Sequence, residues 1–459
     1  MHIPKPLLDK YNTPVPRYTS YPPANYFHAG VTSEQYLELI ESSNHDEPSN
    51  ISFYVHIPFC AQICLYCGCN QIKLGEKSAV DIYLEALKKE IQTITAHLDK
   101  NRKVSQIHYG GGTPNILTTD QLGAINDIFH SQFEFTENPE IAIECHPAHL
   151  DFAYIDGLVN AGFNRISIGV QDFDERILAN VHRLPSRLPI EDLVTYIREK
   201  HPELGVNLDF IYGLPGQTTE SFLATIERAI QIRPDRLVTF SYAHVPWVKK
   251  YQLALEKIGL PTAEDKMEMF ARSRAFLRES GYIEIGMDHY VLPGDELEVA
   301  LQNHTLHRNF QGYATRDTTG QVYAFGTSAI TQLTGSYIQN VKDIETYTAT
   351  LEAGQLPIEK GYVLNQDEIV IRDIITELMC NGYLDFSIIA NRYNQSTEDI
   401  KKLTKFSPNM FDEFVADGLM EYENDIISVT ELGMFFIRNI ATTLNPAYTE
   451  GKGVYSKLV

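Results

Sequence analysis

Three cysteines, Cys60, Cys64 and Cys67, constrain this chain more than any other feature, because they follow one another with the spacing C-x3-C-x2-C. Thiolates packed this closely in a long chain usually hold a metal, and soft sulfur ligands favour zinc or an iron–sulfur cluster. A structural zinc site commonly takes its four ligands as two separated pairs, whereas here Cys69 follows only two residues after the third cysteine. Three thiolates on a [4Fe–4S] cluster leave one iron open to a small molecule. We therefore interpret Cys60, Cys64 and Cys67 as cluster ligands.

Length and composition indicate a globular protein rather than a membrane or fibrous one. The chain has 459 residues, of which 43% are hydrophobic and 21% charged, a profile that predicts two to four domains. It has no apolar run of about 18 residues and no signal-peptide h-region near its first residue, so no membrane span is expected. Apart from the four cysteines between residues 60 and 69, the chain has only Cys145 and Cys380, which lie too far apart in sequence to suggest a disulfide framework. The lack of such a framework predicts a cytoplasmic protein.

The acidic balance limits the possible partners. The formal net charge is −22, from 38 basic and 60 acidic side chains. Nucleic acid needs a basic surface, so we expect no nucleic-acid partner. An anionic substrate remains possible only where basic residues gather locally.

Strand-like and helix-like segments alternate between residues 51 and 242. We predict strands at 51–56, 105–109, 141–144, 165–170, 206–212 and 236–242, and helices at 33–42, 80–98, 119–129, 154–161, 175–181, 190–200 and 219–230. Six consecutive βα units without a hairpin signal predict a parallel sheet that forms a partial (β/α)6 barrel. The fold class is therefore α/β.

Chemically capable residues follow the predicted strands where each one ends. The cysteines follow the first strand, the run Gly110–Thr113 the second, Glu144 and Gln171 the third and fourth, and Ala243 the sixth. Chemistry in such barrels collects at the carboxyl ends of the strands. We therefore expect these residues to share one site.

The segments on either side of residues 51–242 predict additional domains. We predict an N-terminal extension over 1–48, the barrel over 49–285, a substrate-side connection over 286–362 and a mostly helical, winged-helix-like domain over 363–459. The Pro-bounded segment 16–23 suits a strap packed across the protein or a cover for the substrate. Late helices are predicted at 266–280, 367–379, 387–393, 396–402, 409–418 and 431–443, with a hairpin at 420–429.

The cysteine loop resembles the signature of the radical S-adenosylmethionine enzymes, which also places an aromatic residue, here Tyr66, before the last cysteine. The glycine run after the second strand strengthens the resemblance. It implies that the open iron is chelated by the amino and carboxylate groups of S-adenosylmethionine, and that an electron from the cluster cleaves the sulfonium to a 5′-deoxyadenosyl radical. The resemblance thus implies that the motif supplies three ligands rather than four, so that the fourth iron stays open to the cofactor.

A narrower resemblance extends from about residue 11 to the C-terminus. The chain is similar to the oxygen-independent coproporphyrinogen III oxidase family over the segments 16–22, 54–60, 169–173, 211–215, 242–246, 286–289 and 307–313. The resemblance implies oxidative decarboxylation of two propionates of coproporphyrinogen III to vinyl groups, giving protoporphyrinogen IX for haem. It also implies a flavodoxin- or ferredoxin-like electron donor, and we expect a monomer.

Site residues follow from the same resemblance, position by position. Two S-adenosylmethionine molecules are implied, the first contacted by Tyr54, Gly111, Glu144 and Ile330, and the second by Tyr66, Gly112, Thr113, Gln171, Arg183, Asp209 and Ala243. Tyr54 and Cys69 are the catalytic candidates, with Cys69 on the substrate side. Candidates for binding the propionates are Arg17, Arg165, Arg308 and Lys249.

Alternatives to these roles remain open. The glycine run also suits an ordinary βα turn, Glu144 and Asp209 suit capping carboxylates, and Cys69 suits a small buried loop residue. A haem-binding chaperone related to the family would keep the cluster without turnover, although such relatives typically lack Cys69 and the segment 307–313. An enzyme acting on another tetrapyrrole is a third possibility.

Three positions depart from the family pattern. His146 stands where Asp or Asn is common, Asn115 where Thr is usual, and His182 where Asn is common. These departures concern cofactor contacts and leave the three cysteine ligands untouched.

Overall fold

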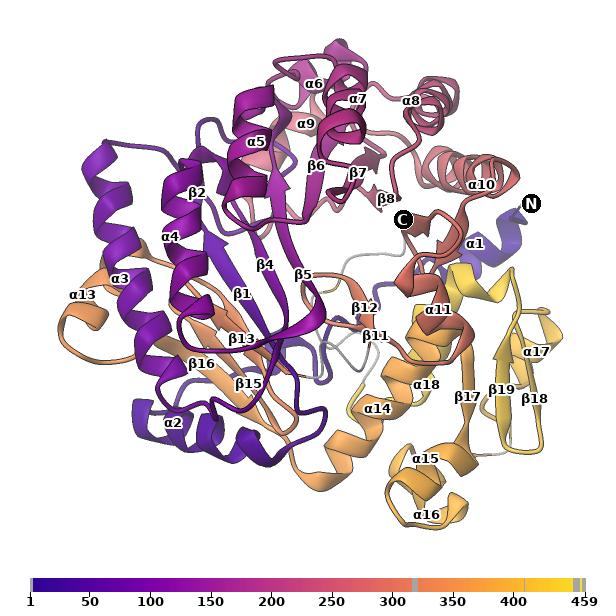
Figure 1. Cartoon of the computed structure of the whole chain (residues 1–459). Coiled ribbons are helices and arrows are strands. Elements are labelled where there is room, and N and C mark those ends of the chain that lie inside the picture. Colours follow the sequence, from indigo (N-terminus) through magenta and orange to yellow (C-terminus); the bar gives the residue numbers. More distant parts are fainter. Residues whose placement is uncertain (1–2, 316–320, 408, 449–454, 456–459) are drawn as a thin grey trace. The chain divides into compact units, whose positions relative to one another are not determined.

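The chain divides into two compact units, which are described separately. The computed structural model describes residues 3–315, 321–407, 409–448 and 455. Residues 28–261 and 317–362 form the first unit, here called the barrel unit, and residues 1–27, 262–316 and 363–459 form the second, here called the helical unit (Figure 1). In the described part of the chain, no helix is both long and apolar enough to cross a membrane. The four-part division expected from sequence stays a prediction.

The barrel unit is built on the predicted parallel strands (Figure 1). Each strand pairs in parallel with the next in the order β1-β4-β5-β6-β7-β8. Their bounds are β1 (Ile51–Ile57), β4 (Val104–Gly111), β5 (Phe135–Cys145), β6 (Arg165–Gln171), β7 (Gly205–Tyr212) and β8 (Arg236–Ser241). Each of them overlaps a strand expected from sequence, so the prediction of a parallel α/β sheet is confirmed.

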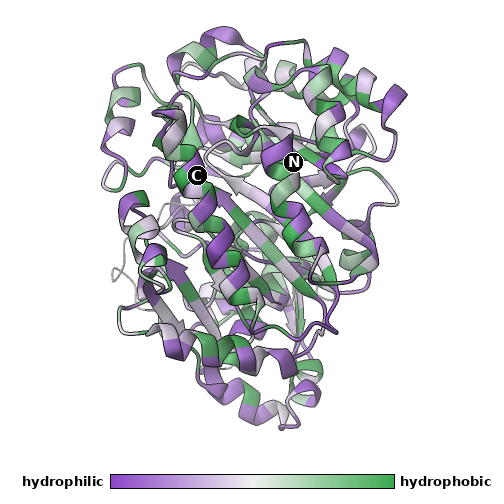
Figure 2. Cartoon of the chain, turned by 60° about the vertical axis from the view of Figure 1, so that its left-hand side comes forward, coloured by the Kyte–Doolittle hydropathy of each residue, from purple (hydrophilic) through white to green (hydrophobic). Residues whose placement is uncertain are grey.

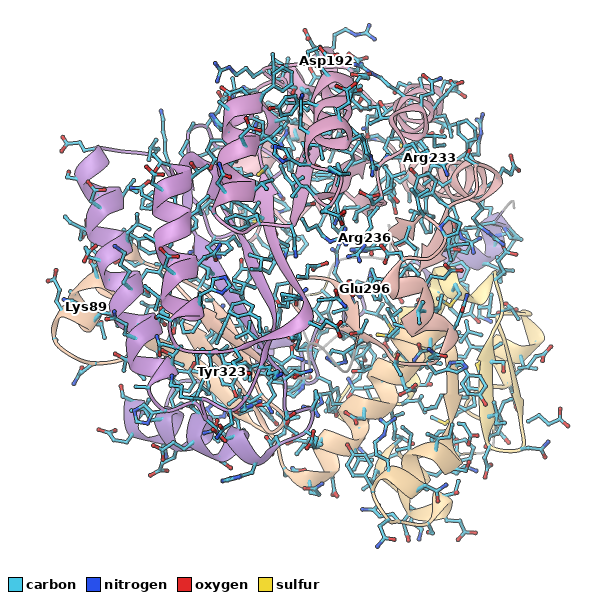
Figure 3. The ribbon with its side chains drawn as sticks, viewed as in Figure 1. Lys89, Asp192, Arg233, Arg236, Glu296 and Tyr323 are labelled. Carbon is cyan, nitrogen blue, oxygen red and sulfur yellow. The ribbon has the colours of Figure 1, made fainter. Side chains whose placement is uncertain are left out.

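The sheet continues beyond β1 through strands that the sequence pattern did not reveal. Strand β13 (Val322–Phe325) lies parallel to β1, followed in the sheet by β14 (Ile330–Gln332), β15 (Ser336–Asn340) and β16 (Ile358–Val363). Most of these strands are too short to show a period, and β13, which joins them to the sheet, pairs with β1 far away in sequence. Tyr323, labelled in Figure 3, fixes β13 through its hydroxyl, which lies 2.8 Å from Arg102 Nη1 and 2.7 Å from Ser43 Oγ.

Helices connect the parallel strands, and Figure 1 shows α3, α4 and α5 along the outer side of β1, β4 and β5. Capping boxes at Thr32, Thr118 and Thr218 begin α2, α4 and α8 by satisfying backbone N–H groups of the first turn. Figure 2 shows hydrophilic and hydrophobic residues mixed along the helices, as expected for helices with one buried face. The helices of this unit are α2 (Ser33–Ser42), α3 (Lys77–Thr95), α4 (Thr119–His130), α5 (Phe152–Asn160), α6 (Glu175–Asn180), α7 (Ile190–Lys200), α8 (Thr219–Ile232), α9 (Leu253–Glu256) and α13 (Ile344–Glu352).

Residues alternate between two environments along the parallel strands. On β6, Ile166 and Ile168 are fully buried, whereas Ser167 and Gly169 between them keep some exposure. The same alternation on β7 buries Leu208 and leaves Asp209 partly accessible. One face of the sheet therefore carries the apolar core, and the other face, here called the inner face, is available for polar groups.

The helical unit has its own core, gathered around the buried residues Ile374, Leu378, Phe386 and Ile440. The predicted hairpin at 420–429 is confirmed, but the last α-helix starts only at Ile437 because Gly433–Phe436 forms a 3-10 turn. Helix α1 was not expected from sequence. The elements are α1 (Lys5–Tyr11), α10 (Ala263–Glu279), β9 (Ile283–Ile285), β10 (His289–Val291), α11 (Glu296–Gln302), β11 (Leu306–Arg308), β12 (Tyr313–Thr315), α14 (Gln366–Asn381), β17 (Tyr383–Asp385), α15 (Phe386–Arg392), α16 (Thr397–Leu403), α17 (Asp412–Ala416), β18 (Met420–Glu423), β19 (Ile426–Val429) and α18 (Ile437–Thr443).

A buried carboxyl group ties α3 to the strands that extend the sheet. Glu90 is 1% exposed and accepts hydrogen bonds from the Gly326 backbone N–H at 2.8 Å, from Asn340 Nδ2 at 2.6 Å and from the Tyr347 hydroxyl. Burial raises the pKa of Glu90 to about 7, against the opposing effect of these three donors. Glu90 therefore contributes hydrogen bonds to the fold, but its ionised form carries a desolvation penalty, which increases as the pH rises.

This penalty predicts a stability difference that depends on pH. A Glu carboxyl titrates near 4.5 when unfolded and Glu90 near 7 when folded, so the native state binds more protons between these values and the free energy of unfolding falls as pH rises through them. At about 1.4 kcal/mol per pKa unit, the loss is on the order of 3 kcal/mol. We expect the melting temperature of the native chain minus that of Glu90→Gln to decrease from pH 5 to pH 8. The exposed Glu85→Gln on the same helix is the control, and a difference that stays constant with pH for Glu90→Gln would contradict the assignment.

Candidate functional site

The inner face of the barrel unit brings Tyr54, His108 and Glu144 together. Tyr54 on β1 lies opposite His108 on β4, and their rings stack with centroids 6.0 Å apart. His108 Nε2 donates to Glu144 Oε1 at 3.0 Å. Burial lowers the pKa of His108, but the Glu144 carboxylate outweighs it, so the net shift is upward. His108 was not predicted, although the alternation along β4 places it on the same face as Gly110 and could have identified it.

The cysteine loop follows β1 and carries four thiols in different environments. Cys60 and Cys64 are buried, Cys67 is half-buried and Cys69 is exposed. The loop starts from the short strand β2 (Phe59–Cys60), which pairs in parallel with β3 (Ile72–Lys73). Among the described residues, no three His, Cys, Asp or Glu side chains are arranged to hold a single metal ion. A [4Fe–4S] cluster does not require such convergence, because each thiolate binds a different iron atom.

Thr113 and Arg183 place hydrogen-bond donors beside Cys60 and Cys64. Thr113 Oγ1 donates to Cys60 Sγ at 3.2 Å, and Arg183 Nη1 lies 3.7 Å from Cys64 Sγ and 2.9 Å from the Tyr66 hydroxyl. Burial raises the pKa of Cys60 to about 11, and it also raises the pKa of Cys64 despite the opposing charge of Arg183. Iron binding would replace the thiol protons, and these donors stabilise the resulting sulfur charge.

A short segment after β8 supports the backbone of the loop. Lys249 Nζ donates to the Cys69 carbonyl at 2.7 Å, the Tyr251 hydroxyl donates to the Cys67 carbonyl, and Gln252 Nε2 donates to the Tyr66 carbonyl at 2.9 Å. Gln252 is fully buried. The sequence carried no signal for this support, because its acceptors are main-chain carbonyls. Lys249, a candidate for propionate binding, is used here instead.

The glycine run occupies a space that no side chain could share. Gly111 has φ +118°, and a Cβ on it would lie 2.6 Å from His56 Cε1. A Cβ on Gly110 would lie 2.8 Å from Glu144 Oε1, and one on Gly112 would lie 2.6 Å from the Pro58 carbonyl oxygen. The run thus packs directly against β1 and Glu144, which is more than an ordinary turn requires.

Polar groups without partners lie at the end of β6. Gln171 has φ +69°, and its Oε1 and the Nε of Arg183 are buried without a hydrogen-bond partner in the described part of the chain. Both side chains approach Gly169, where a Cβ would lie 2.7 Å from Gln171 Nε2 and 3.1 Å from Arg183 Nη2. Buried polar atoms are rarely left unsatisfied, so this corner fits a polar ligand beside the cysteine loop.

The remaining predicted cofactor residues also belong to the barrel unit. Asp209 Oδ2 accepts a hydrogen bond from Ser167 Oγ at 2.7 Å, and the Ala243 carbonyl accepts one from Gln252. Ile330 begins β14, and the pairing of Val322 with Gln332 sets it level with Ala324, the neighbour of Tyr54. The cofactor contacts predicted for these residues stay predictions.

The departures from the family pattern have local explanations. Asn115 and His146 exchange two hydrogen bonds, from Asn115 Nδ2 to the His146 carbonyl at 3.1 Å and from the His146 N–H to Asn115 Oδ1 at 2.9 Å. Burial, with Arg183 nearby, lowers the pKa of His146 to about 2, so its ring is neutral. His182 has an exposed side chain and φ +52°, a conformation that Asn adopts more readily than most residues.

Two of the four residues predicted to bind propionates, Arg165 and Lys249, lie in the barrel unit, where each interacts with other groups of the protein. Arg165 Nε lies 2.6 Å from Glu140 Oε2, and Arg236, labelled in Figure 3, lies 3.4 Å from the same oxygen. Arg165 begins β6, at the opposite end of the strand from Gln171, and is therefore a poor candidate for substrate. Lys249 holds the cysteine loop. Arg17 and Arg308 belong to the helical unit.

Comparison with known proteins agrees with a barrel that carries such a loop. Residues 54–229 match the Radical SAM superfamily, whose members use a [4Fe–4S] cluster and S-adenosylmethionine. An oxygen-independent coproporphyrinogen III oxidase of Synechocystis is 39% identical over 447 residues, covering 97% of this chain and 95% of the relative. The Escherichia coli protein of that name is 38% identical, with 95% and 93% of the chains covered. The solved structure of coproporphyrinogen III oxidase from Escherichia coli, described as a radical SAM enzyme, covers 98% of this chain and 100% of its own, with 35% identity and a TM-score of 0.88.

The matches to the coproporphyrinogen III oxidases span almost the whole of both chains. The protein is a radical SAM enzyme by its superfamily match. Within that class, the chain belongs to the oxygen-independent coproporphyrinogen III oxidase family. The resemblance stated from sequence is thereby confirmed.

The glycine run makes a direct prediction. Gly111→Ala would combine a strained backbone conformation, which costs about 1–3 kcal/mol, with a clash against His56, so the run must move away from the cysteine loop. We expect at least about tenfold weaker S-adenosylmethionine binding in anaerobic equilibrium dialysis, with the iron content retained. Gly75→Ala is the control, because a Cβ there meets nothing within 4 Å. Equal binding by both variants would show that the close packing of the run is irrelevant to the cofactor.

Proposed function

We propose that this protein catalyses the oxygen-independent oxidative decarboxylation of two propionate side chains of coproporphyrinogen III to vinyl groups, giving protoporphyrinogen IX. The observation on which this rests is the agreement, over nearly the full chain, with several proteins of that name and with the solved structure. The barrel supports it by joining the cysteine loop, the glycine run and Glu144 at the carboxyl ends of neighbouring strands. The product suits a place in haem biosynthesis.

The residues present fit the cofactors of the superfamily. When bound, the cluster and S-adenosylmethionine supply the one-electron chemistry that removes a hydrogen atom from a C–H bond. Cys60, Cys64 and Cys67 would bind the cluster, and no fourth thiolate is required. The unpaired Gln171 Oε1 and Arg183 Nε offer an acceptor and a donor to a polar ligand at the loop.

Side chains on the inner face are positioned to orient a bound cofactor. Tyr54 stacks on His108 and donates to or accepts from His56 Nδ1 at 3.1 Å, so its ring orientation is set by two neighbours. Glu144 presents its carboxylate on the inner face, held by His108 at one oxygen. This arrangement suits binding of hydroxyl or ammonium groups of a cofactor, which is the role proposed for Tyr54 and Glu144.

Finer features of the function are part of the same proposal. Two S-adenosylmethionine molecules would bind, the second near Tyr66, Gln171 and Arg183, which the geometry supports by the unpaired atoms at that corner. The protein would act as a monomer and take electrons from a flavodoxin- or ferredoxin-like donor. Cys69 would face the substrate, since the residue is exposed at the end of the loop while its carbonyl is held by Lys249.

The cluster assignment is tested by replacing one ligand. Cys64→Ser should lose most of the iron and essentially all turnover of coproporphyrinogen III in an anaerobic assay of reconstituted protein, because Ser is a poor ligand for iron in a thiolate site. Cys145→Ser is the control, since Cys145 is equally buried but lies on β5 outside the loop. Full iron and activity in Cys64→Ser would refute the cluster. Intact wild-type protein that binds haem tightly without forming vinyl product would favour a chaperone.

A separate role for Cys69 predicts a different pattern. Cys69→Ser should keep the iron content and the absorbance spectrum of the cluster, but lower the rate of vinyl-product formation by at least about tenfold, on the order of the loss of one positioned polar group. Cleavage of S-adenosylmethionine uncoupled from product formation should remain. A variant with unchanged turnover would return Cys69 to the status of a loop residue.

A further inference from the structure

The helical unit contains a cluster of basic side chains that the cofactor chemistry does not use. Arg17 comes from the extended N-terminal segment, Lys266 from α10 and Arg308 from the end of β11. Arg308 Nη1 donates to the Arg17 carbonyl at 3.3 Å, which joins two of these segments. We call Arg17, Lys266 and Arg308 the basic cluster.

The cluster is held in place by the hairpin of β11 and β12. Arg308 lies opposite Tyr313 in the antiparallel pair, and its guanidinium carbon sits 5.3 Å from the centre of the Tyr313 ring. The Tyr313 hydroxyl accepts the Met287 N–H at 3.1 Å, and a Cβ on Gly286 would collide with that hydroxyl. This packing fixes the guanidinium before any ligand arrives, which reduces the entropy lost on binding.

A carboxyl group, Asp288, faces Arg308 and Arg17 of the basic cluster, and one of its oxygens lies 2.7 Å from His289 Nδ1. Burial raises the pKa of Asp288, but His289, Arg308 and Arg17 together outweigh it and keep the group ionised. Burial and the charge of Arg17 lower the pKa of Lys266 to about 8, because the two positive charges lie close enough to repel each other.

One donor of the cluster lacks a partner. Arg308 Nε is buried and has no hydrogen-bond partner in the described ranges. A guanidinium matches a carboxylate through two parallel N–H donors, so an open Nε beside a fixed guanidinium suits an incoming carboxylate. In a chain of net charge −22, an anionic ligand also needs such a local concentration of positive charge.

We propose that Arg17, Lys266 and Arg308 form a carboxylate-binding subsite that takes a propionate of the tetrapyrrole substrate. This inference rests on the proposed function and adds the group that the subsite recognises. The four propionates of coproporphyrinogen III are carried by one macrocycle, so anchoring one carboxylate orients the others. The subsite binds substrate and takes no part in holding the cluster or S-adenosylmethionine, whose candidate residues lie in the barrel unit.

The test uses reconstituted full-length protein and two porphyrin probes. Coproporphyrin III is air-stable, fluorescent and carries the four carboxylates, whereas its tetramethyl ester carries none. Arg308→Gln and Lys266→Met should each weaken coproporphyrin III binding by about tenfold, and the loss should shrink as salt rises. Binding of the ester should match that of the wild type. Lys402→Met, an exposed lysine on α16 paired with Asp399, is the control of equal charge change.

The outcomes separate the subsite from the function itself. Turnover by Arg308→Gln should show a raised KM for coproporphyrinogen III, with the KM for S-adenosylmethionine and the iron content unchanged. If the variants bind both probes as the wild type does while turnover persists, the subsite is overturned and the function stands. Equal weakening for acid and ester would also overturn carboxylate recognition. If wild-type protein neither binds coproporphyrin III nor forms vinyl product, the proposed function fails. Should Arg308→Gln not fold, Lys266→Met and Arg17→Gln decide the matter.

Discussion

The hydrogen-bond ladder between parallel strands is the constraint on which the site depends. It places Tyr54 opposite His108, His56 opposite Gly110 and Gly169 opposite Asp209. Successive side chains of a strand point to opposite faces of the sheet. A slip of one residue would therefore turn the apolar residues of a strand to the polar inner face and its polar residues into the apolar core. Burial of the apolar face, at about 25 cal/mol per Å² of apolar surface, therefore sets the register that assembles the polar groups.

The cysteine loop depends on a different kind of support. Backbone hydrogen bonds hold part of it, in the pairing of β2 with β3 and from the Leu65 N–H to the Val181 carbonyl. The side chains of Lys249, Tyr251 and Gln252 donate to three of its carbonyls. Such support satisfies buried backbone groups where no strand is available. Thr113 and Arg183 stabilise negative charge on the sulfur atoms.

Strong local patterns were predictable, and weak or distant ones were not. The parallel strands and the helices between them show clear periods and caps, such as the capping box at Thr118, and most were predicted close to their observed bounds. Strand β5 is the exception, because it begins at Phe135 rather than at residue 141. Strands β13–β16 were missed because most are short and because β13, which joins them to the sheet, pairs with the distant strand β1. Helix α1 was missed because only two of its residues, Leu8 and Tyr11, are buried, which leaves little amphipathic pattern. His108 was overlooked among candidate site residues, although its place on β4 follows from alternation.

The sequence by itself determined the candidate ligands and their order along the chain: three cysteines at a fixed spacing, a glycine run, and strand ends that carry acids and amides. These are local features, and their chemistry follows from residue type. Only the tertiary structure decided which groups meet, including Arg183 with Cys64, Asn115 with His146, Glu90 with Gly326, and Arg308 with Arg17. Such pairs lie far apart along the chain, and their proximity depends on how whole strands and helices pack. The charge and burial that tune each group are therefore properties of the fold.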